Sequence, residues 1–229
     1  MAAHPYSAVL FDLDGTIVDS APGITSSLAY TFEAMGLAVP SPAKLLEWVG
    51  PPIMDSFRDL AGFDLLTSAR ALAIYREHYV MTGVFDAQLY PGVPEVLRAI
   101  QTSGVPLSLA TSKPESTARL ILEHYDLAKY FDELTGASED EVRSAKADVV
   151  EEALRRLRVR GADLSRPVMV GDRHHDVIGA AAHDVPTIFV TWGYGAPEEA
   201  VGTVASVDTA AELLTALGLE VPLTPSGSI

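Results

Sequence analysis

The stretch at residues 6–16, YSAVLFDLDGT, decides the fold of this chain. Its apolar run over residues 6–11 stops at acidic residues, which is the pattern of a short buried strand. Similar runs follow at residues 106–110, 168–170 and 187–190, with helical patterns between them. Buried strands that alternate with helices predict an α/β fold, in which a doubly wound parallel sheet is covered by helices on both faces.

One long segment interrupts this alternation. Between residues 21 and 86 no stretch has the pattern of a strand, and apolar residues recur at helical spacing in four groups. We therefore expect a small all-helical cap domain over residues 19–87, inserted into a core domain made of residues 1–18 and 88–229. The alternative is that these helices pack directly on the sheet. The insert is favoured because a strand-to-strand crossover usually needs only about a dozen residues.

The composition excludes several classes of protein. With 16 basic against 31 acidic residues, the net charge is -15, which repels nucleic acid polymers and anionic membranes. The chain has no Cys, so disulfides and thiolate zinc sites are excluded. No apolar stretch approaches the roughly 20 residues of a membrane span, and we expect a cytoplasmic protein. A phosphorylated ligand would need local positive charge, such as a divalent cation and a Lys.

The first group of candidate catalytic residues is the Asp12–Asp14 pair. On an extended chain these two side chains lie on the same side, at the carboxyl end of a strand, where open parallel sheets bind ligands. Asp12 can accept a phosphoryl group as a nucleophile, and Asp14 can protonate the leaving oxygen and later deprotonate water. Gly15 permits a sharp backbone turn before Thr16. An acidic turn or helix cap is the alternative reading of an isolated acidic pair.

The second group is Thr111-Ser112-Lys113, at the end of the next strand. Hydroxyl and backbone N–H groups between a strand and a helix can hold an anion, and Pro114 suits the start of that helix. An ordinary Ser or Thr helix cap is the alternative. We expect Lys113 to be solvated or near the mouth of the site.

Two further groups lie towards the C-terminus. Lys146 opens a predicted helix, where its charge opposes the helix dipole; a role in binding phosphate would explain it, and a solvated Lys is the alternative. Asp172 and Asp176 follow the strand at 168–170 and lie one helical turn apart. Together with Asp12 they offer the carboxylate ligands that Mg²⁺ prefers, although two acids at a helix start are also typical caps.

These motifs, in this order, resemble the haloacid-dehalogenase-like (HAD) superfamily over nearly the whole chain. The resemblance implies a Rossmann-like core and a helical cap that closes over the site and selects the substrate. Dehalogenase members lack the second Asp of the pair, so Asp14 favours phosphate chemistry. Residues 48–52 (WVGPP), 110–114 (ATSKP), 171–173 (GDR) and 192–195 (WGYG) are similar to members known as 5'-nucleotidases or phosphoglycolate phosphatases.

The resemblance also implies a role for each motif residue. Asp12 would be the nucleophile, and Asp14 the acid/base whose backbone carbonyl also binds Mg²⁺. Thr111 would bind the transferring phosphoryl group, and Lys146 would neutralise charge. The implied metal ligands, direct or through water, are Asp12, Asp14, Asp172 and Asp176. The remaining candidates for substrate contact are Gly15, Thr16, Ser112, Lys113 and, in the cap, Arg58.

The sequence therefore predicts a Mg²⁺-dependent phosphatase, monomeric or homodimeric. Its partner would be a small phosphorylated metabolite, either a nucleoside monophosphate or phosphoglycolate, and neither a nucleic acid polymer nor a membrane. Two alternatives remain open. One is a phosphomutase acting on a sugar phosphate, which would use the same groups. The other is a non-catalytic phosphate-binding module, such as a receiver-like domain with a phosphorylated Asp.

Overall fold

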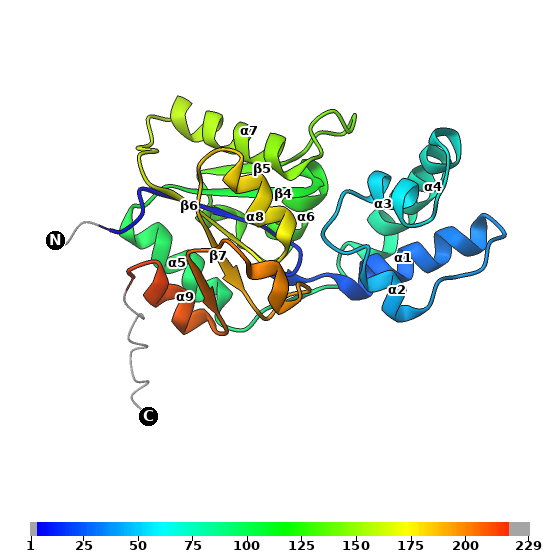
Figure 1. Cartoon of the computed structure of the whole chain (residues 1–229), viewed down its shortest axis with the longest axis horizontal. Coiled ribbons are helices and arrows are strands. Elements are labelled where there is room, and N and C mark those ends of the chain that lie inside the picture. Colours follow the sequence, from blue (N-terminus) through cyan, green and yellow to red (C-terminus); the bar gives the residue numbers. More distant parts are fainter. Residues whose placement is uncertain (1–3, 220–229) are drawn as a thin grey trace.

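The computed structural model describes residues 4–219, and Figure 1 shows an α/β core with a group of helices to one side. Residues 1–3 and 220–229, which fall within the predicted core boundaries, lie outside the described range. The core holds a six-stranded sheet in the order β5-β4-β1-β6-β7-β8, and all its pairings are parallel. Its strands are β1 (Ala8–Phe11), β4 (Leu107–Pro114), β5 (Glu133–Ala137), β6 (Pro167–Gly171), β7 (Thr187–Val190) and β8 (Ala205–Val207).

Helices cover both faces of this sheet, as predicted. Along β1, Val9 and Phe11 belong to one apolar core, and Ala8 and Leu10 belong to another on the opposite face. The first core includes apolar residues of α5 (Val93–Ser103), α6 (Glu115–His124) and α9 (Ala210–Ala216). The second includes those of α7 (Lys146–Val159) and α8 (His174–Ala181). Because β1 is apolar on both faces, it lies in the centre of the sheet.

The strand order places the site. The chain runs outward from β1 through β4 to β5, and then continues on the other side of β1 with β6, β7 and β8. In open α/β sheets a crevice forms at the carboxyl ends of the strands where this order reverses. The end of β1, and therefore Asp12, lies at this reversal.

A two-stranded antiparallel pair marks where the chain leaves the core and returns. Val18–Asp19 (β2) pairs with Gln88–Leu89 (β3). Between them lie α1 (Ala21–Ala34), α2 (Pro42–Leu46), α3 (Ile53–Asp59), α4 (Leu65–His78) and the π-helical turn η1 (Tyr79–Gly83). Figure 1 shows these helices beside the sheet, not on its faces. Aromatic rings pack between them, such as Trp48 and Phe57 at 5.2 Å between centroids.

Some elements differ from the sequence-based expectation. The strands β5 (ELTGA) and β8 (ASV) were not predicted, because small and polar residues give them little strand propensity. Strand β4 runs on to Pro114, beyond the predicted end at residue 110, with a shift of register after Ala110. Two short 3₁₀ turns complete the core, η2 (Ala128–Tyr130) and η3 (Pro197–Ala200). Within residues 4–219, every helix is too short or too polar to cross a membrane.

Candidate active site

Asp12 and Lys146 form the centre of the site. Asp12 directly follows β1, and its N–H donates to the carbonyl of Val170 on β6, 2.9 Å away. Lys146, the first residue of α7, donates from Nζ to Asp12 Oδ1 at 2.6 Å and to the carbonyl of Ala110 at 3.0 Å. Both side chains are buried. The alternative of a solvated Lys146 is therefore wrong.

Lys146 also faces a second carboxylate. Its Nζ lies 2.8 Å from Asp176 Oδ1, although without the geometry of a hydrogen bond. Burial by itself would lower the pKa of Lys146, but Asp12 and Asp176 outweigh burial and raise it. The ammonium thus stays charged although it is buried.

Asp172 and Asp176 meet through a helix cap. Asp172 precedes α8, and Asp176 Oδ2 accepts the N–H groups of Asp172 and Arg173 at 3.1 and 3.0 Å. The carboxylate of Asp172 is held by the Thr16 hydroxyl at 3.1 Å and the Tyr194 N–H at 2.7 Å. The two acids lie close together because Asp176 caps the start of the helix, whereas the sequence spacing predicts that one helical turn places both on one face.

The three acids are suited to a divalent cation. Oxygen atoms of Asp12, Asp172 and Asp176 lie within 4.8 Å of one another, and all three side chains are buried. Burial raises the pKa of Asp12 to about 6, against the opposing effect of Lys146. Burial, together with Asp176 and Asp12, raises the pKa of Asp172 well above its usual range. Three buried carboxylates around one Lys need further positive charge, so this donor set fits a divalent metal.

Two glycines let the backbone approach these acids. A Cβ on Gly15 or on Gly193 would overlap the carboxylate of Asp172. Gly15 also has a φ of +84°, a conformation that other residues rarely adopt. Its N–H donates to the carbonyl of Val18 at 2.8 Å, which turns the chain from the site into β2.

Lys113 is buried against the second acid of the pair. Its Nζ lies 2.9 Å from Asp14 Oδ1 and 2.8 Å from Oδ2, and the Ser20 hydroxyl also donates to Oδ1. The same ammonium lies 4.9 Å from the centre of the Tyr79 ring in the cap. The expectation that Lys113 is solvated is therefore wrong, although the residue does line the cavity beside Asp14. Strand β4 continues through this residue and directs its side chain inward.

The remaining predicted residues divide into two groups. Thr111 and Ser112 are buried on β4, and the Thr111 hydroxyl accepts the N–H of Lys113 at 3.3 Å. Arg58, by contrast, is an exposed residue of α3 that pairs with Asp55 and Asp59, at 3.1 and 2.9 Å. It does not line the cavity beside Asp14. The structure therefore does not bring Arg58 to the site.

Tyr194 forms hydrogen bonds at the site that were not predicted from the sequence. Its hydroxyl accepts the N–H groups of Ser20 and Ala21 at 2.8 and 3.0 Å and donates to Asp19 Oδ1 at 2.8 Å. The hydroxyl thus connects the loop after β7 to the start of α1. The backbone N–H of Tyr194 donates to Asp172 Oδ2. The signal was the WGYG stretch at residues 192–195, whose two glycines indicate close backbone approach.

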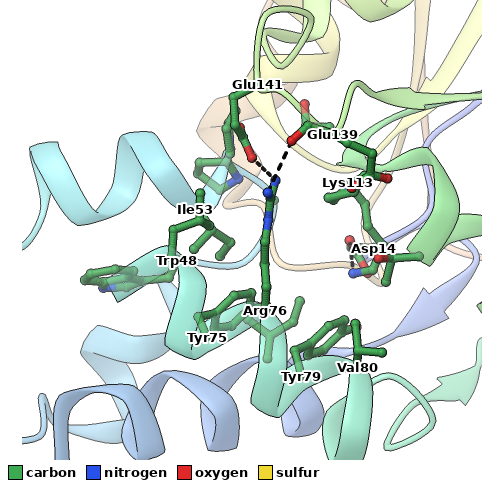
Figure 2. A pocket seen from close by; sticks show the side chains of 18 of the residues that line it. Asp14, Trp48, Ile53, Tyr75, Arg76, Tyr79, Val80, Lys113, Glu139 and Glu141 are labelled. Carbon is green, nitrogen blue, oxygen red and sulfur yellow. Dashed lines mark hydrogen bonds and ion pairs between the residues drawn. The ribbon is translucent and has the colours of Figure 1, made fainter. Parts of the chain in front are cut away.

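A cavity of about 220 Å³ opens between the core and the cap, beside Asp14 and Lys113 (Figure 2). Arg76 of α4 crosses it to pair with the Glu141 carboxylate, and donates to the carbonyl of Glu139 at 3.3 Å. On another side of the cap, Arg173 donates to the Val49 carbonyl at 2.6 Å. These two contacts add to those of Tyr194 and Lys113 in connecting the cap helices to the core around the site.

This fold and site define a class of hydrolase that transfers phosphoryl groups. Acids, a Lys and a hydroxyl meet at the strand ends of a doubly wound sheet, under a helical cap. The chain belongs to the haloacid dehalogenase-like hydrolase family, whose model matches residues 9–190.

Several curated relatives cover most of the chain. The tyrosine-protein kinase PtkA of Mycobacterium tuberculosis is 41% identical over 215 residues, which are 92% of this chain and 72% of the relative. A 5'-nucleotidase of Pseudomonas aeruginosa is 35% identical, covering 86% of this chain and 88% of its own. A phosphoglycolate phosphatase of Rhodospirillum rubrum is 34% identical, covering 94% and 92%.

Solved structures agree with this assignment. A predicted phosphatase from Clostridium acetobutylicum matches with a TM-score of 0.86 and 38% identity, over 92% of this chain and 97% of that one. The structure of PtkA from Mycobacterium tuberculosis matches with a TM-score of 0.80 and 40% identity, over 93% and 98%. The chain is an HAD-family phosphatase, that is, a phosphoric monoester hydrolase with the predicted α/β core.

Proposed function

We propose that this phosphatase moves the phosphoryl group of a small phosphomonoester onto Asp12 and then onto water, with the help of Mg²⁺. The observation that carries this proposal is the contact of Asp12 with the buried Lys146, beside Asp172 and Asp176. A carboxylate so placed can attack phosphorus, while the fixed ammonium stabilises charge on the transferring group.

The acids indicate what else the site binds. Asp12, Asp172 and Asp176 would hold Mg²⁺, with the backbone carbonyl of Asp14 as a further ligand, and the ion would neutralise the phosphate oxygens. Asp176 Oδ2 accepts two N–H groups, so its Oδ1, which faces Lys146, is the oxygen that would hold the ion. The Thr111 hydroxyl would bind a phosphoryl oxygen.

Two displacements complete the reaction. In the first, an Asp12 oxygen forms a bond to phosphorus, the ester P–O bond breaks, and Asp14 gives its proton to the leaving alcohol. In the second, Asp14 takes a proton from water, the water oxygen attacks phosphorus, and the bond to Asp12 breaks to release phosphate. Lys113 and Ser20 hold the Asp14 carboxylate in position between these proton transfers.

The names of the relatives support two substrates, a nucleoside monophosphate and phosphoglycolate. The cytoplasmic location and a monomeric or homodimeric state stay predictions from the sequence.

The nucleophile is tested with Asp12→Asn. We expect this variant to release almost no phosphate from a panel of nucleoside monophosphates, phosphoglycolate and sugar phosphates, with Mg²⁺ present. Acid-quenched wild-type protein should carry a phosphoryl group on the peptide that contains Asp12. The matched control is Asp148→Asn, at an exposed acid outside the site, which should keep full activity. Near-full phosphate release by Asp12→Asn would contradict the proposal.

The likeness to PtkA supports a second candidate, transfer of a phosphoryl group to a tyrosine hydroxyl. ATP together with a tyrosine-containing peptide distinguishes the two. A kinase yields phosphopeptide in proportion to the ATP consumed, whereas a phosphatase yields free phosphate. A phosphomutase would instead return the phosphoryl group to a sugar, and a receiver-like module would keep a stable phospho-Asp12 without turnover.

A further inference from the structure

The cavity beside Asp14 has predominantly apolar walls on its cap side. Trp48, Ile53, Leu72, Tyr75 and Tyr79 line it, and Figure 2 shows the aromatic rings of α4 and η1 along its floor. The rings of Tyr75 and Tyr79 stack at 5.5 Å with an interplanar angle of 10°. Such walls stabilise a planar, apolar group by burial and by ring stacking.

The charges in this cavity are already paired. Among the described residues that line it, the basic ones are Lys113 and Arg76. Lys113 is bound to both oxygens of Asp14, and Arg76 is paired with Glu141. Glu139 adds a further acid. A carboxylate entering here would meet these acids and would have to compete with them for Lys113 and Arg76, so the cavity disfavours an anionic leaving group.

Two buried polar atoms of the residues that line the cavity have no hydrogen-bond partner among the described residues, Arg76 Nε and the Tyr79 hydroxyl, and the charge of Arg76 is already paired with Glu141. Tyr79 is 3% exposed, and within residues 4–219 its hydroxyl makes no hydrogen bond. Burial raises the pKa of Tyr79 well above its usual range, so the hydroxyl keeps its proton and can donate it. A buried hydroxyl without a partner is unfavourable, and a ligand that accepts its hydrogen bond removes this cost.

We infer that this cavity binds the leaving group of the substrate, and that this group is an uncharged alcohol bearing a planar aromatic ring whose polar atom accepts a hydrogen bond from Tyr79. The inference rests on the proposed function, because Asp14, the proposed acid/base, lines the cavity together with Ser112 and Lys113. It favours a ring-bearing monoester, such as a nucleoside monophosphate, over the carboxylate-bearing phosphoglycolate.

The first test compares kcat/KM for a nucleoside monophosphate, phenyl phosphate and phosphoglycolate. We expect both ring-bearing esters to exceed phosphoglycolate by about tenfold or more, since apolar burial and stacking act only on the ring. Equal or faster hydrolysis of phosphoglycolate would overturn the inference and leave the phosphatase proposal intact. Hydrolysis of none of the three would overturn both.

The second test is Tyr79→Phe, which removes only the hydroxyl. For the nucleoside monophosphate, kcat/KM should fall roughly 3- to 10-fold, the worth of one hydrogen bond. For phenyl phosphate, whose ring has no polar atom, the fall should be smaller. The melting temperature should stay the same or rise, because an unpartnered buried hydroxyl is removed. A lower melting temperature with equal losses on both esters would show a structural role and overturn this assignment.

The matched control is Tyr30→Phe, at an exposed tyrosine of α1 that does not line the cavity; its kinetics should equal those of the wild type.

A third variant tests the charges of the cavity. Glu141→Gln releases Arg76 from its carboxylate partner, so the ratio of kcat/KM for phosphoglycolate to that for the nucleoside monophosphate should rise several-fold. An unchanged ratio would contradict the exclusion of anionic leaving groups.

Discussion

The ammonium of Lys113 binds both carboxylate oxygens of Asp14, at 2.9 and 2.8 Å, and both side chains are buried. The proposed acid/base is thus oriented by a cation from the neighbouring strand. Because the same ammonium lies over the Tyr79 ring, this ion pair connects the core site to the cap. Replacing Lys113 should therefore affect stability and catalysis together.

Lys113→Met leaves Asp14 as a buried carboxylate without its cation. Removing one partner of a buried pair costs about 3–5 kcal/mol, and we expect a loss of this order in the free energy of unfolding, measured with urea. The rate of hydrolysis should also fall, because Asp14 loses its orientation. Lys129→Met removes an exposed ion pair with Asp126 and serves as the control, with no measurable change expected. Equal unfolding curves for the two variants would refute this role of Lys113.

Asp172→Asn should stabilise the protein in the absence of metal. It makes one of three clustered, buried carboxylates neutral and removes repulsion from Asp12 and Asp176. The same change removes a metal ligand, so added Mg²⁺ should raise the melting temperature of the wild type but not that of the variant. Calorimetry with EDTA and with Mg²⁺ measures both effects. An equal Mg²⁺-induced rise in both proteins would exclude Asp172 as a ligand.

Gly15→Ala and Gly36→Ala separate backbone strain from steric overlap. Both glycines have positive φ angles, +84° and +72°, so each substitution costs about 1 kcal/mol of backbone strain. Only at Gly15 would the new Cβ overlap the Asp172 carboxylate, since the space beside Gly36 is open. We expect Gly15→Ala to destabilise more and to reduce hydrolysis sharply. Similar unfolding free energies for the two variants would speak against close packing at Asp172.

Glu199 should make stability depend on pH in the acid range. Burial would raise the pKa of this carboxyl, but hydrogen bonds from the His174 backbone and ring, from Ala196 and from Arg173 lower it to about 2. A depressed pKa means that the stabilisation is complete above the ordinary value of 4.5 and is lost as the pH falls towards 2.

The measurement is the melting temperature of the wild type and of Glu199→Gln, at about pH 6 and about pH 3. At about pH 6 the wild type should melt at a higher temperature than Glu199→Gln, and this difference between the two proteins should be smaller at about pH 3. Because Arg173 also holds the Val49 carbonyl of the cap, KM should rise in this variant. Glu198→Gln, at the exposed neighbour, is the control. A difference that does not vary with pH would disprove the assignment to this carboxylate.

Much of the site followed from local patterns. Asp12 and Asp172 come directly after strands and Thr111 lies towards the end of one, and parallel strands end at one edge of their sheet, so these three residues had to be neighbours. Strands β5 and β8 escaped prediction because tertiary pairing compensates for their weak propensity. Arg58 was a candidate contact in the cap, but it pairs with acids of its own helix and does not line the cavity.

The sequence by itself determined the α/β core, the helical insert and the identity of the acids, because hydrophobic periodicity and motif spacing are local properties. Only the tertiary structure decided which charges are buried together. Lys113 binds Asp14, which lies 99 positions earlier in the sequence. Tyr194 contacts both Asp172 and the first residue of α1. The energy of a charge depends on its distance to partners and to water, and these distances are set only when cap and core pack against each other.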